Sequence, residues 1–416
     1  MKVLWLSNRA LSDRNSIKSG TWLFAMRDII ENDINLINLT DNSTIKKITH
    51  IQVGNFEEYI LPFFKIHRGL PSKKHIAEIL TIIDSISPDI IHIWGTEHYW
   101  AQLLSRGFLS KWKVILEVQG LIGSCANVFY AGLTASEIHH CHALKDFIKP
   151  SKALHKQYLH FMNLSRYEHE VLSSCDFIST QSDWTRDQIR LFIPQHTKVY
   201  KTLRPIRKEF TQSKKWSTQE ANKSLTIFTS TAYSTTFKGL HILIKALSVL
   251  KNRYTDCTLC IAGLNLYDKP KWKHSGYERL LLNIISQYNL QENIRFLGPL
   301  TEQQIITQLL QSHVYVNSSF VESYSAATAE ALILGVPSVL AYSGAMPNFS
   351  SELPIGLYYS PMDYIDCAAK IDILYTDPTL RNTLTQNAIH LMSDKCDNEA
   401  VRKIQLDIYN DIIKQR

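Results

Sequence analysis

Two glutamates, Glu322 and Glu330, stand eight positions apart in the segment "VESYSAATAEALILGVPSV" (321–339), which is otherwise small and apolar. Eight helical positions are a little over two turns, so both acids lie on one side of a helix that starts early in this segment. A buried carboxylate needs a hydrogen-bond donor or solvent. The alternative is a Glu322 that satisfies a helix dipole and an unrelated surface Glu330. Small residues between the acids leave room for a ligand to approach the backbone: Ser325, Ala326, Ala327 and Ala329.

A lysine marks the second candidate site. In "TAYSTTFKGLHILIKAL" (231–247) a strand ends in a Thr- and Ser-rich loop, and a helix begins near Lys238 and Gly239. A helix N-terminus presents free N–H groups and partial positive charge, and the lysine adds a full charge, which suits a phosphate. The spacing is not that of a Walker P-loop. The stretch alone also fits an ordinary turn before a helix.

The elements that must position these residues alternate regularly along the 416 residues. Short apolar runs are followed by longer helical patterns, which predicts βαβ units, parallel sheets and an α/β fold. The polar, basic stretch 206–224 interrupts this alternation and is typical of a linker. We therefore expect two doubly wound, Rossmann-like domains, 1–205 and 225–395, and a one-sided helix at 396–416 that packs on either domain.

Composition limits the function classes. The net charge of +7 is mild and no nucleic-acid-binding module is present, so no nucleic-acid partner is expected. No stretch approaches the roughly 18 to 20 apolar residues that span a bilayer, and the N-terminus predicts a buried strand instead of a signal peptide. Seven cysteines without a disulfide framework are typical of a cytoplasmic protein, and Cys257 and Cys260 fall in a strand pattern that predicts core packing.

Two stretches, "HRGLPSKKH" (67–75) and "FIKPSKALHKQYLHF" (147–161), mix basic residues with apolar ones. Such a composition suits peripheral contact with an anionic membrane, here the inner face of the cell membrane, although ordinary solvated faces explain it as well. The adjacent residues 139–142, three histidines and a cysteine, lack a carboxylate ligand pattern and point in different directions on a helix. No metal site is therefore expected.

The motifs together resemble the GT-B glycosyltransferases of family 4, of the bacterial surface-polysaccharide type. The resemblance to family 4 is carried by "SPDIIHIWG" (87–95), by "FKGLHILIKAL" (237–247), by "IRFLGPLTEQQIITQLL" (294–310) and by the E-x7-E segment with the following Gly-x-Pro. The similarity to the bacterial surface-polysaccharide branch is carried by "VILEVQGLIG" (114–123), "TQSDWTRDQI" (180–189) and "KTLRPIRKEF" (201–210). It implies an acceptor-binding first domain and a nucleotide-sugar second domain facing a cleft, with the C-terminal helix crossing back to the first domain. It also implies a glycosyltransferase of the hexosyltransferase class.

The resemblance assigns roles by position. Lys238 and the backbone of Ala326, Ala327 and Thr328 meet the diphosphate, Glu322 faces the donor sugar and Glu330 bonds the ribose hydroxyls. Gly20 lets the first domain approach the phosphates, and Leu300 flanks the base. Glu97 and His98, which follow a predicted strand, are candidate contacts of the acceptor or the diphosphate, and so are Gln119 and Arg204.

Three positions depart from the family pattern. Tyr233 stands where the family has an arginine, Gln119-Gly120 where many members have His-Gly, and Gly344-Ala345 where they have Gly-Gly. The missing arginine removes a charge worth roughly 4 kcal/mol for two unit charges about 4 Å apart at an effective dielectric near 20. Arg204 is a candidate replacement, or alternatively a structural arginine at the domain junction.

The expected reaction is sugar transfer from a UDP- or GDP-linked donor to a glycan or lipid-linked oligosaccharide acceptor in cell-surface polysaccharide synthesis. The resemblance implies retention of the anomeric configuration and no metal ion or other cofactor. Two alternatives stay open: a nucleotide-sugar epimerase on the same fold, and a catalytically silent glycosyltransferase-like binding subunit.

Overall fold

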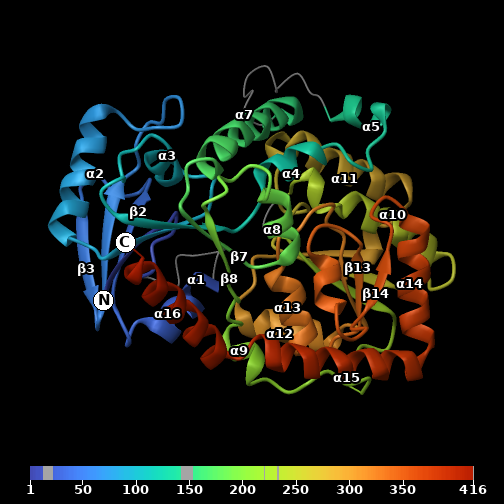
Figure 1. The fold of residues 1–416 in the computed structure, drawn as a ribbon. Helices are drawn as coiled ribbons and strands as arrows, with labels where there is room; N and C mark the ends of the chain where they lie inside the picture. The colour runs from blue at the N-terminus through green and yellow to red at the C-terminus, as the bar shows by residue number, and fades with distance from the viewer. Residues whose placement is uncertain (13–21, 142–152, 220, 232–233, 416) are drawn as a thin grey trace. The chain divides into compact units, whose positions relative to one another are not determined.

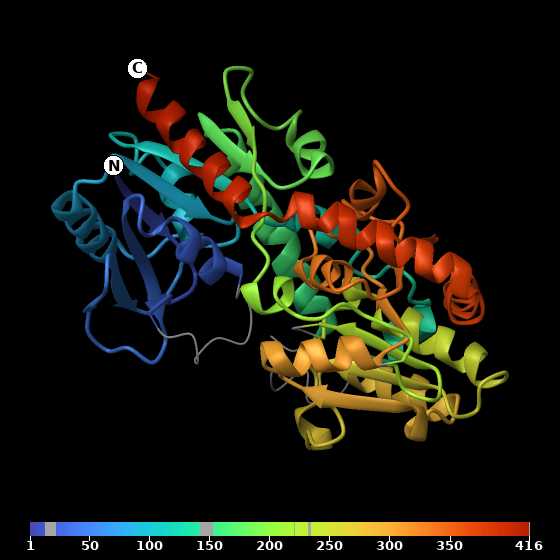
Figure 2. The ribbon, with the colours of Figure 1, turned by 90° about the horizontal axis from the view of Figure 1, so that it is seen from below.

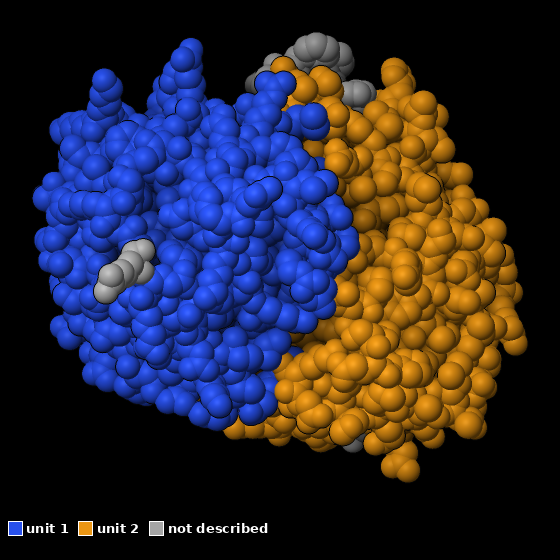
Figure 3. All heavy atoms as spheres, viewed as in Figure 1, with its two compact units in different colours: residues 1–123, 162–205, 396–416 blue, residues 124–161, 206–395 orange. Residues whose placement is uncertain are grey.

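The computed structural model describes residues 1–12, 22–141, 153–219, 221–231 and 234–415 (Figure 1). The chain forms two compact units, which Figure 3 colours separately. The first comprises residues 1–123, 162–205 and 396–416, and the second comprises 124–161 and 206–395. Two residues singled out from the sequence, Gly20 and Tyr233, lie outside the described residues.

The first unit is built on a sheet in the order β3-β4-β2-β1-β5-β6-β7-β8, in which only β3 pairs antiparallel with its neighbour. Its central strands are continuous apolar runs because helices cover both faces of the sheet. The strands are β1 (Lys2–Leu6), β2 (Asn35–Asn42), β3 (Thr49–Val53), β4 (Phe56–Pro62), β5 (Ile90–Trp94), β6 (Lys113–Val118), β7 (Phe177–Thr180) and β8 (Lys198–Lys201).

Two cores lie on the two faces of this sheet, because successive side chains of a strand point to opposite sides. Leu4 and Leu6 pack with α2 (Lys73–Ile86) and α3 (Tyr99–Ser105), whereas Val3 and Trp5 pack with α1 (Trp22–Ile30) and α16 (Asn398–Lys414). The remaining helices that contribute to this unit are α7 (Leu154–Leu172), in its part after residue 161, and α8 (Asp183–Ile189).

The C-terminal helix α16 belongs to the first unit, which confirms the expected return of the chain; Figure 2 shows it in red beside the sheet. Trp5 Nε1 donates a hydrogen bond of 3.0 Å to the Tyr409 hydroxyl of this helix, and His92 Nδ1 lies 2.8 Å from the same oxygen. Burial lowers the pKa of His92 to about 3. The histidine of the 87–95 motif is therefore a neutral core residue.

The second unit is built on a parallel sheet in the order β11-β10-β9-β12-β13-β14, so both predicted doubly wound sheets are confirmed. The strands are β9 (Thr226–Ser230), β10 (Thr258–Ala262), β11 (Ile294–Gly298), β12 (Val314–Asn317), β13 (Ser338–Ala341) and β14 (Leu357–Tyr359). The main helices are α10 (Leu240–Lys251), α11 (Gly276–Gln287), α12 (Glu302–Gln311), α13 (Ala326–Ile333), α14 (Tyr364–Thr376) and α15 (Pro378–Lys395). Cys257 and Cys260 are buried at β10, as core packing requires.

The unit boundaries differ from the expected domains in two places. Residues 124–161, expected in the first domain, belong to the second unit, where Lys245 Nζ on α10 lies 2.6 Å from Glu137 Oε1. The stretch 206–224, expected as a linker, also belongs to this unit, because Trp216 is buried and its Nε1 donates to the Ser312 carbonyl at 2.7 Å. The shorter helices of these segments are α4 (Ile122–Asn127), α5 (Ala135–His140) and α9 (Lys208–Thr211).

The strand order of the second unit indicates where a ligand would bind. From β9 the chain continues to β10 and β11 on one side of the sheet, whereas β12, β13 and β14 lie on the other. Such a reversal opens a crevice at the carboxyl ends of the two adjacent strands, where ligands of doubly wound sheets bind. The loops after β9 and β12 contain Lys238 and Glu322, so the topology brings these two residues together.

Candidate active site

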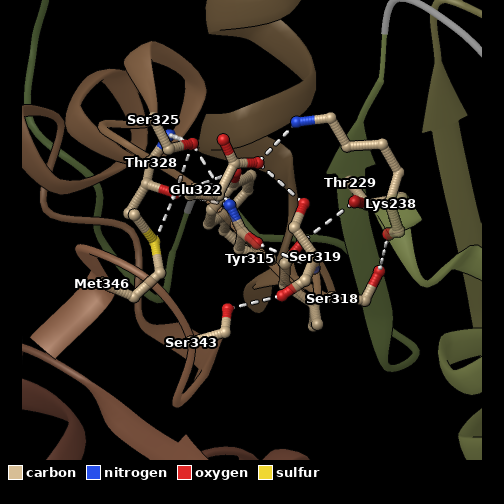
Figure 4. Close-up of polar contacts among 12 residues, drawn as sticks. Thr229, Lys238, Tyr315, Ser318, Ser319, Glu322, Ser325, Thr328, Ser343 and Met346 are labelled. Atoms are coloured by element: carbon tan, nitrogen blue, oxygen red, sulfur yellow. Dashed lines mark hydrogen bonds and ion pairs between the residues drawn. The ribbon is translucent and has the colours of Figure 1, made fainter. Parts of the chain in front are cut away.

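Lys238 and Glu322 form an ion pair, with Lys238 Nζ 2.6 Å from Glu322 Oε1 (Figure 4). The same carboxylate oxygen accepts a hydrogen bond of 2.7 Å from the Ser319 hydroxyl. Both side chains remain partly accessible, the lysine at 32% and the glutamate at 14%. The two residues with predicted catalytic roles therefore share one solvent-accessible site, 84 positions apart in sequence.

Gly239 allows the loop that carries Lys238 to pack closely against the loop after β12. Its backbone is left-handed, at φ 65°, and a Cβ there would lie 1.8 Å from the Ser318 carbonyl oxygen. This close approach lets the Ser318 hydroxyl donate to the Lys238 carbonyl at 2.9 Å, and the Phe320 N–H donate to the Phe237 carbonyl at 2.8 Å. The short 3-10 helix η3 (Thr236–Lys238) ends at this glycine.

Gly344 likewise allows close packing of the backbone against Glu322. Its φ is 52°, and a Cβ there would lie 2.2 Å from the Glu322 carbonyl oxygen, which accepts the Ala345 N–H at 2.7 Å. Ala345 itself has φ −82°, which any residue adopts. The first glycine of the expected Gly-Gly pair is therefore required by geometry, whereas alanine fits at the second position.

A network of hydroxyl groups caps the start of α13. The Ser325 hydroxyl accepts the Thr328 N–H at 3.3 Å, and Asn317 Nδ2 donates to the side chains of both residues, at 3.1 and 3.0 Å. Thr328 is fully buried in this cap. Because the first N–H groups of a helix have no acceptor within it, those of Ala326 and Ala327 are the ones that the cap leaves for an anion.

Glu330, on the second turn of α13, is paired with an arginine that sequence reasoning missed. Arg207 Nε lies 2.8 Å and Nη2 2.7 Å from Glu330 Oε1, and Arg207 Nη1 lies 2.9 Å from Glu302 Oε1. Burial raises the pKa of Glu330, and the charge of Arg207 opposes that rise. The two carboxylates raise the pKa of Arg207 in spite of its burial. Arg207 lies in the polar stretch 206–224, whose composition predicts a linker, and a linker residue is not expected to have a buried partner.

Leu300 lies half-buried between β11 and α12, two residues before Glu302. The contacts of Arg207 with Glu302 and Glu330 therefore connect the loop that carries Leu300 to the predicted ribose carboxylate. The contact of Leu300 with a base stays a prediction.

The remaining candidates lie in the first unit. Glu97 is exposed after β5, and its Oε1 accepts a hydrogen bond of 3.3 Å from Asn8 Nδ2; His98 Nε2 lies 3.6 Å from Asp41 Oδ2. Asn8 follows β1, Asp41 lies at the end of β2, and Glu97 and His98 follow β5, at the reversal of strand order in this sheet. Gln119 is half-buried after β6, and the Arg204 guanidinium lies over the Trp22 ring at 4.1 Å.

Metal-ligand clusters and membrane-spanning helices are both absent from the described residues. Within that part of the chain, no group of three His, Cys, Asp or Glu side chains is arranged to hold a metal ion. None of its helices combines the length and apolar character needed to cross a bilayer.

The profile of the family described as glycosyl transferases group 1 matches residues 210–391, a range that lies within the second unit. A phosphatidylinositol N-acetylglucosaminyltransferase subunit of Homo sapiens is 27% identical over 116 residues, which are 28% of this chain and 22% of that protein. The uncharacterized glycosyltransferase YqgM of Bacillus subtilis (strain 168) is 32% identical over 113 residues, 27% of this chain and 29% of that protein. The chain thus matches less than a third of the length of either curated relative.

Solved structures are similar over nearly the whole chain. Sucrose-phosphate synthase from Thermosynechococcus elongatus has a TM-score of 0.72 at 13% identity, covering 99% of this chain and 98% of that one. Anabaena HepE, solved in complex with UDP-glucose, has a TM-score of 0.67 at 14% identity, covering 99% of this chain and 100% of that one. Identities this low show the fold alone, which is GT-B, as the sequence motifs predicted.

Proposed function

We propose that this chain, which carries a group 1 glycosyl transferase domain, is a retaining glycosyltransferase that needs no metal ion. It moves a sugar from a UDP- or GDP-linked donor to a hydroxyl of a glycan or lipid-linked acceptor in cell-surface polysaccharide synthesis. The observation that carries this proposal is the contact of 2.6 Å between Lys238 Nζ and Glu322 Oε1 beside the start of α13. A cation, a carboxylate and free helix N–H groups at one site match the needs of glycosyl transfer from a diphosphate.

In this reaction the bond between the anomeric carbon and the diphosphate oxygen breaks. The acceptor oxygen bonds to that carbon on the same face, and the acceptor proton passes to the leaving phosphate oxygen. Lys238 has three N–H donors and uses one on Glu322, so two remain for the diphosphate. Together with the N–H groups of Ala326 and Ala327, they stabilise the negative charge that develops there. Glu322 holds the sugar hydroxyls and offsets positive charge on the ring.

The donor class draws support from the solved structures, since HepE was solved with UDP-glucose bound. In the present chain, Glu330 supplies a carboxylate for ribose hydroxyls, and Leu300 supplies an apolar side chain for the base. We assign acceptor contacts to Glu97, His98 and Gln119, and an acceptor or diphosphate contact to Arg204.

A membrane-bound acceptor draws support from the surface of the first unit. Phe63 is 61% and Ile66 37% exposed, and they stand close in sequence to exposed Arg68, Lys73 and Lys74. Basic residues beside exposed apolar ones suit the anionic inner face of a cell membrane. The second such stretch lies partly outside the described residues; its described part, 153–161, includes the exposed Leu159.

Incubation of the full chain with a panel of nucleotide sugars and lipid-linked acceptors tests the proposal. We expect release of one nucleoside diphosphate, a product whose anomeric configuration matches the donor by NMR, and unchanged turnover in EDTA. An isomeric nucleotide sugar would instead indicate an epimerase. Neither binding nor release with any donor would indicate a silent subunit.

A further inference from the structure

Arg207 lies at the centre of a buried charge cluster that draws residues from three elements of the second unit. Its guanidinium contacts Glu330 on α13 and Glu302 on α12, at distances between 2.7 and 2.9 Å. The side chains of Arg207 and Glu330 are only 12% and 11% exposed, whereas that of Glu302 is 38% exposed. The better-buried carboxylate is therefore the one with the two contacts to the arginine.

The geometry of these contacts orients Glu330. Both Arg207 Nε and Arg207 Nη2 point to Oε1, and the planar guanidinium holds this arrangement rigidly. An ionised carboxylate has about four lone-pair sites on its two oxygens. Both of these arginine contacts end on Oε1, and we assign Oε2 to two neighbouring hydroxyl groups of a ribose.

Arg207 is itself held in place by α9. It stands at the N-cap of this four-residue helix, and its guanidinium lies over the ring of the fully buried Phe210 at 4.7 Å. The helix thus anchors the arginine through this ring while the two glutamates bind its nitrogens. This arrangement explains why a stretch with linker composition folds onto the second unit.

The cluster is poorly suited to bind a phosphate directly. One arginine faces two carboxylates in contact, and Glu209 adds a third negative charge that acts on Glu330. Nε donates to Glu330 and Nη1 to Glu302, and Nη2 lies 2.7 Å from Glu330 Oε1. Arg207 therefore does not replace the cation that is absent at Tyr233.

We propose that Arg207 is a positioning residue for nucleotide recognition, which keeps Glu330 ionised and aimed at the ribose hydroxyls of the donor. This inference rests on the proposed function. It adds to the E-x7-E segment a partner more than a hundred positions away, and it assigns α9 a role in the donor site.

A pH effect follows from the charges that face Glu330. Burial raises its pKa, Glu302 and Glu209 add to that rise, and Arg207 opposes it. The carboxylate accepts ribose hydroxyls above its pKa and loses this ability as the pH falls through it. Loss of Arg207 raises this pKa further, so the carboxylate loses its ability to accept ribose hydroxyls at a higher pH.

The test compares nucleotide affinities by calorimetry, with the full chain and the nucleoside diphosphate that it prefers. The ribonucleotide, its 2′-deoxy form and pyrophosphate are titrated from pH 5.5 to 8.5. Wild type is expected to prefer the ribonucleotide by about 10-fold or more, since a hydrogen bond to a charged group contributes about 1.5 to 3 kcal/mol. In Arg207→Ala this preference falls to about twofold, while pyrophosphate affinity stays within about threefold.

Two variants serve as controls. Arg207→Lys keeps the positive charge but lacks the planar guanidinium with its fixed N–H donors. We therefore expect this variant to retain the wild-type pH profile of nucleotide affinity and to lose most of the preference for the ribonucleotide. It also keeps the test open should Arg207→Ala fail to fold. Glu302→Gln alters the other contact of the arginine and is expected to keep the preference.

The outcomes separate this inference from the proposed function. If wild type binds the nucleotide but both Arg207 variants keep its preference and pH profile, Arg207 has no positioning role. If Arg207→Ala weakens pyrophosphate as much as the nucleotide, the arginine is a diphosphate ligand and the inference is wrong. If wild type binds no nucleoside diphosphate, the proposed function fails, and the inference falls with it.

Discussion

Replacement of Gly239 by alanine tests whether the contact between two loops positions Lys238. The new Cβ would lie 1.8 Å from the Ser318 carbonyl oxygen, and ordinary contact begins at 3.4 Å, so the loops must separate by about 1.6 Å. The φ of 65° adds a conformational cost of roughly 1 to 2 kcal/mol for a residue with a Cβ. A displacement of about 1 Å at a catalytic group can lower the rate about 100-fold.

Gly298→Ala is a matched control, because Gly298 has the same φ of 65° but its nearest neighbour to a Cβ, Asn265 Cβ, lies 3.8 Å away. Both variants therefore share the conformational cost, and only Gly239→Ala carries the clash. We expect Gly239→Ala to lose about 100-fold in nucleoside diphosphate release and about 2 kcal/mol more unfolding free energy than the control. Release assays and urea denaturation measure the two effects.

The reasoning would be refuted by equal stability of the two alanine variants together with turnover of Gly239→Ala within threefold of wild type. That result would mean that the loops separate freely and that Lys238 does not depend on their contact. Normal turnover with a large loss of stability would refute the positioning part alone.

Three further predictions concern single groups. Lys238→Ala should lower turnover about 100- to 1000-fold, as loss of one preorganised donor to a developing anion does, and a turnover assay showing less than a threefold loss would contradict its role. Thr328→Val removes a buried hydroxyl that bonds Asn317 and Ser325, so denaturation should show a loss of about 1 to 2 kcal/mol. His92 and His241 have pKa values lowered to about 3, so the folded state takes up their protons later than the unfolded state as the pH falls. Below about pH 6.5 each should lower the unfolding free energy by about 1.4 kcal/mol per pH unit, and denaturation series of His92→Gln and His241→Gln should show shallower slopes.

Much of the site could be predicted because its parts follow strands. The loops after β9 and β12 carry Lys238 and Glu322, and parallel strands bring their carboxyl ends to one edge of a sheet. The strand order that makes these two loops neighbours is a property of the whole sheet and does not follow from local patterns. It could be predicted only because the sequence motifs resemble a known family. The required glycine at Gly344 and the tolerated alanine at Ala345 became clear only from their backbone angles.

The contacts of Arg207 and of the segment 124–161 could not be predicted from local sequence patterns. The polar composition of 206–224 predicts a linker because local patterns do not show tertiary contacts. In the structure Trp216 and Phe210 are buried, and Arg207 contacts Glu330. Likewise, 124–161 follows a strand of the first sheet in sequence, but its ion pair with Lys245 belongs to the second unit.

The amino-acid sequence by itself determined the alternation of strands and helices, the two doubly wound sheets and the loops that carry Lys238 and Glu322, because these depend on local periodicity and on how parallel strands end. Only the tertiary structure decided which distant residues complete the site. The pairing of Arg207 with Glu330 joins residues 123 positions apart. Such a contact stabilises the fold through burial and charge neutralisation, and these arise only when the whole unit has packed.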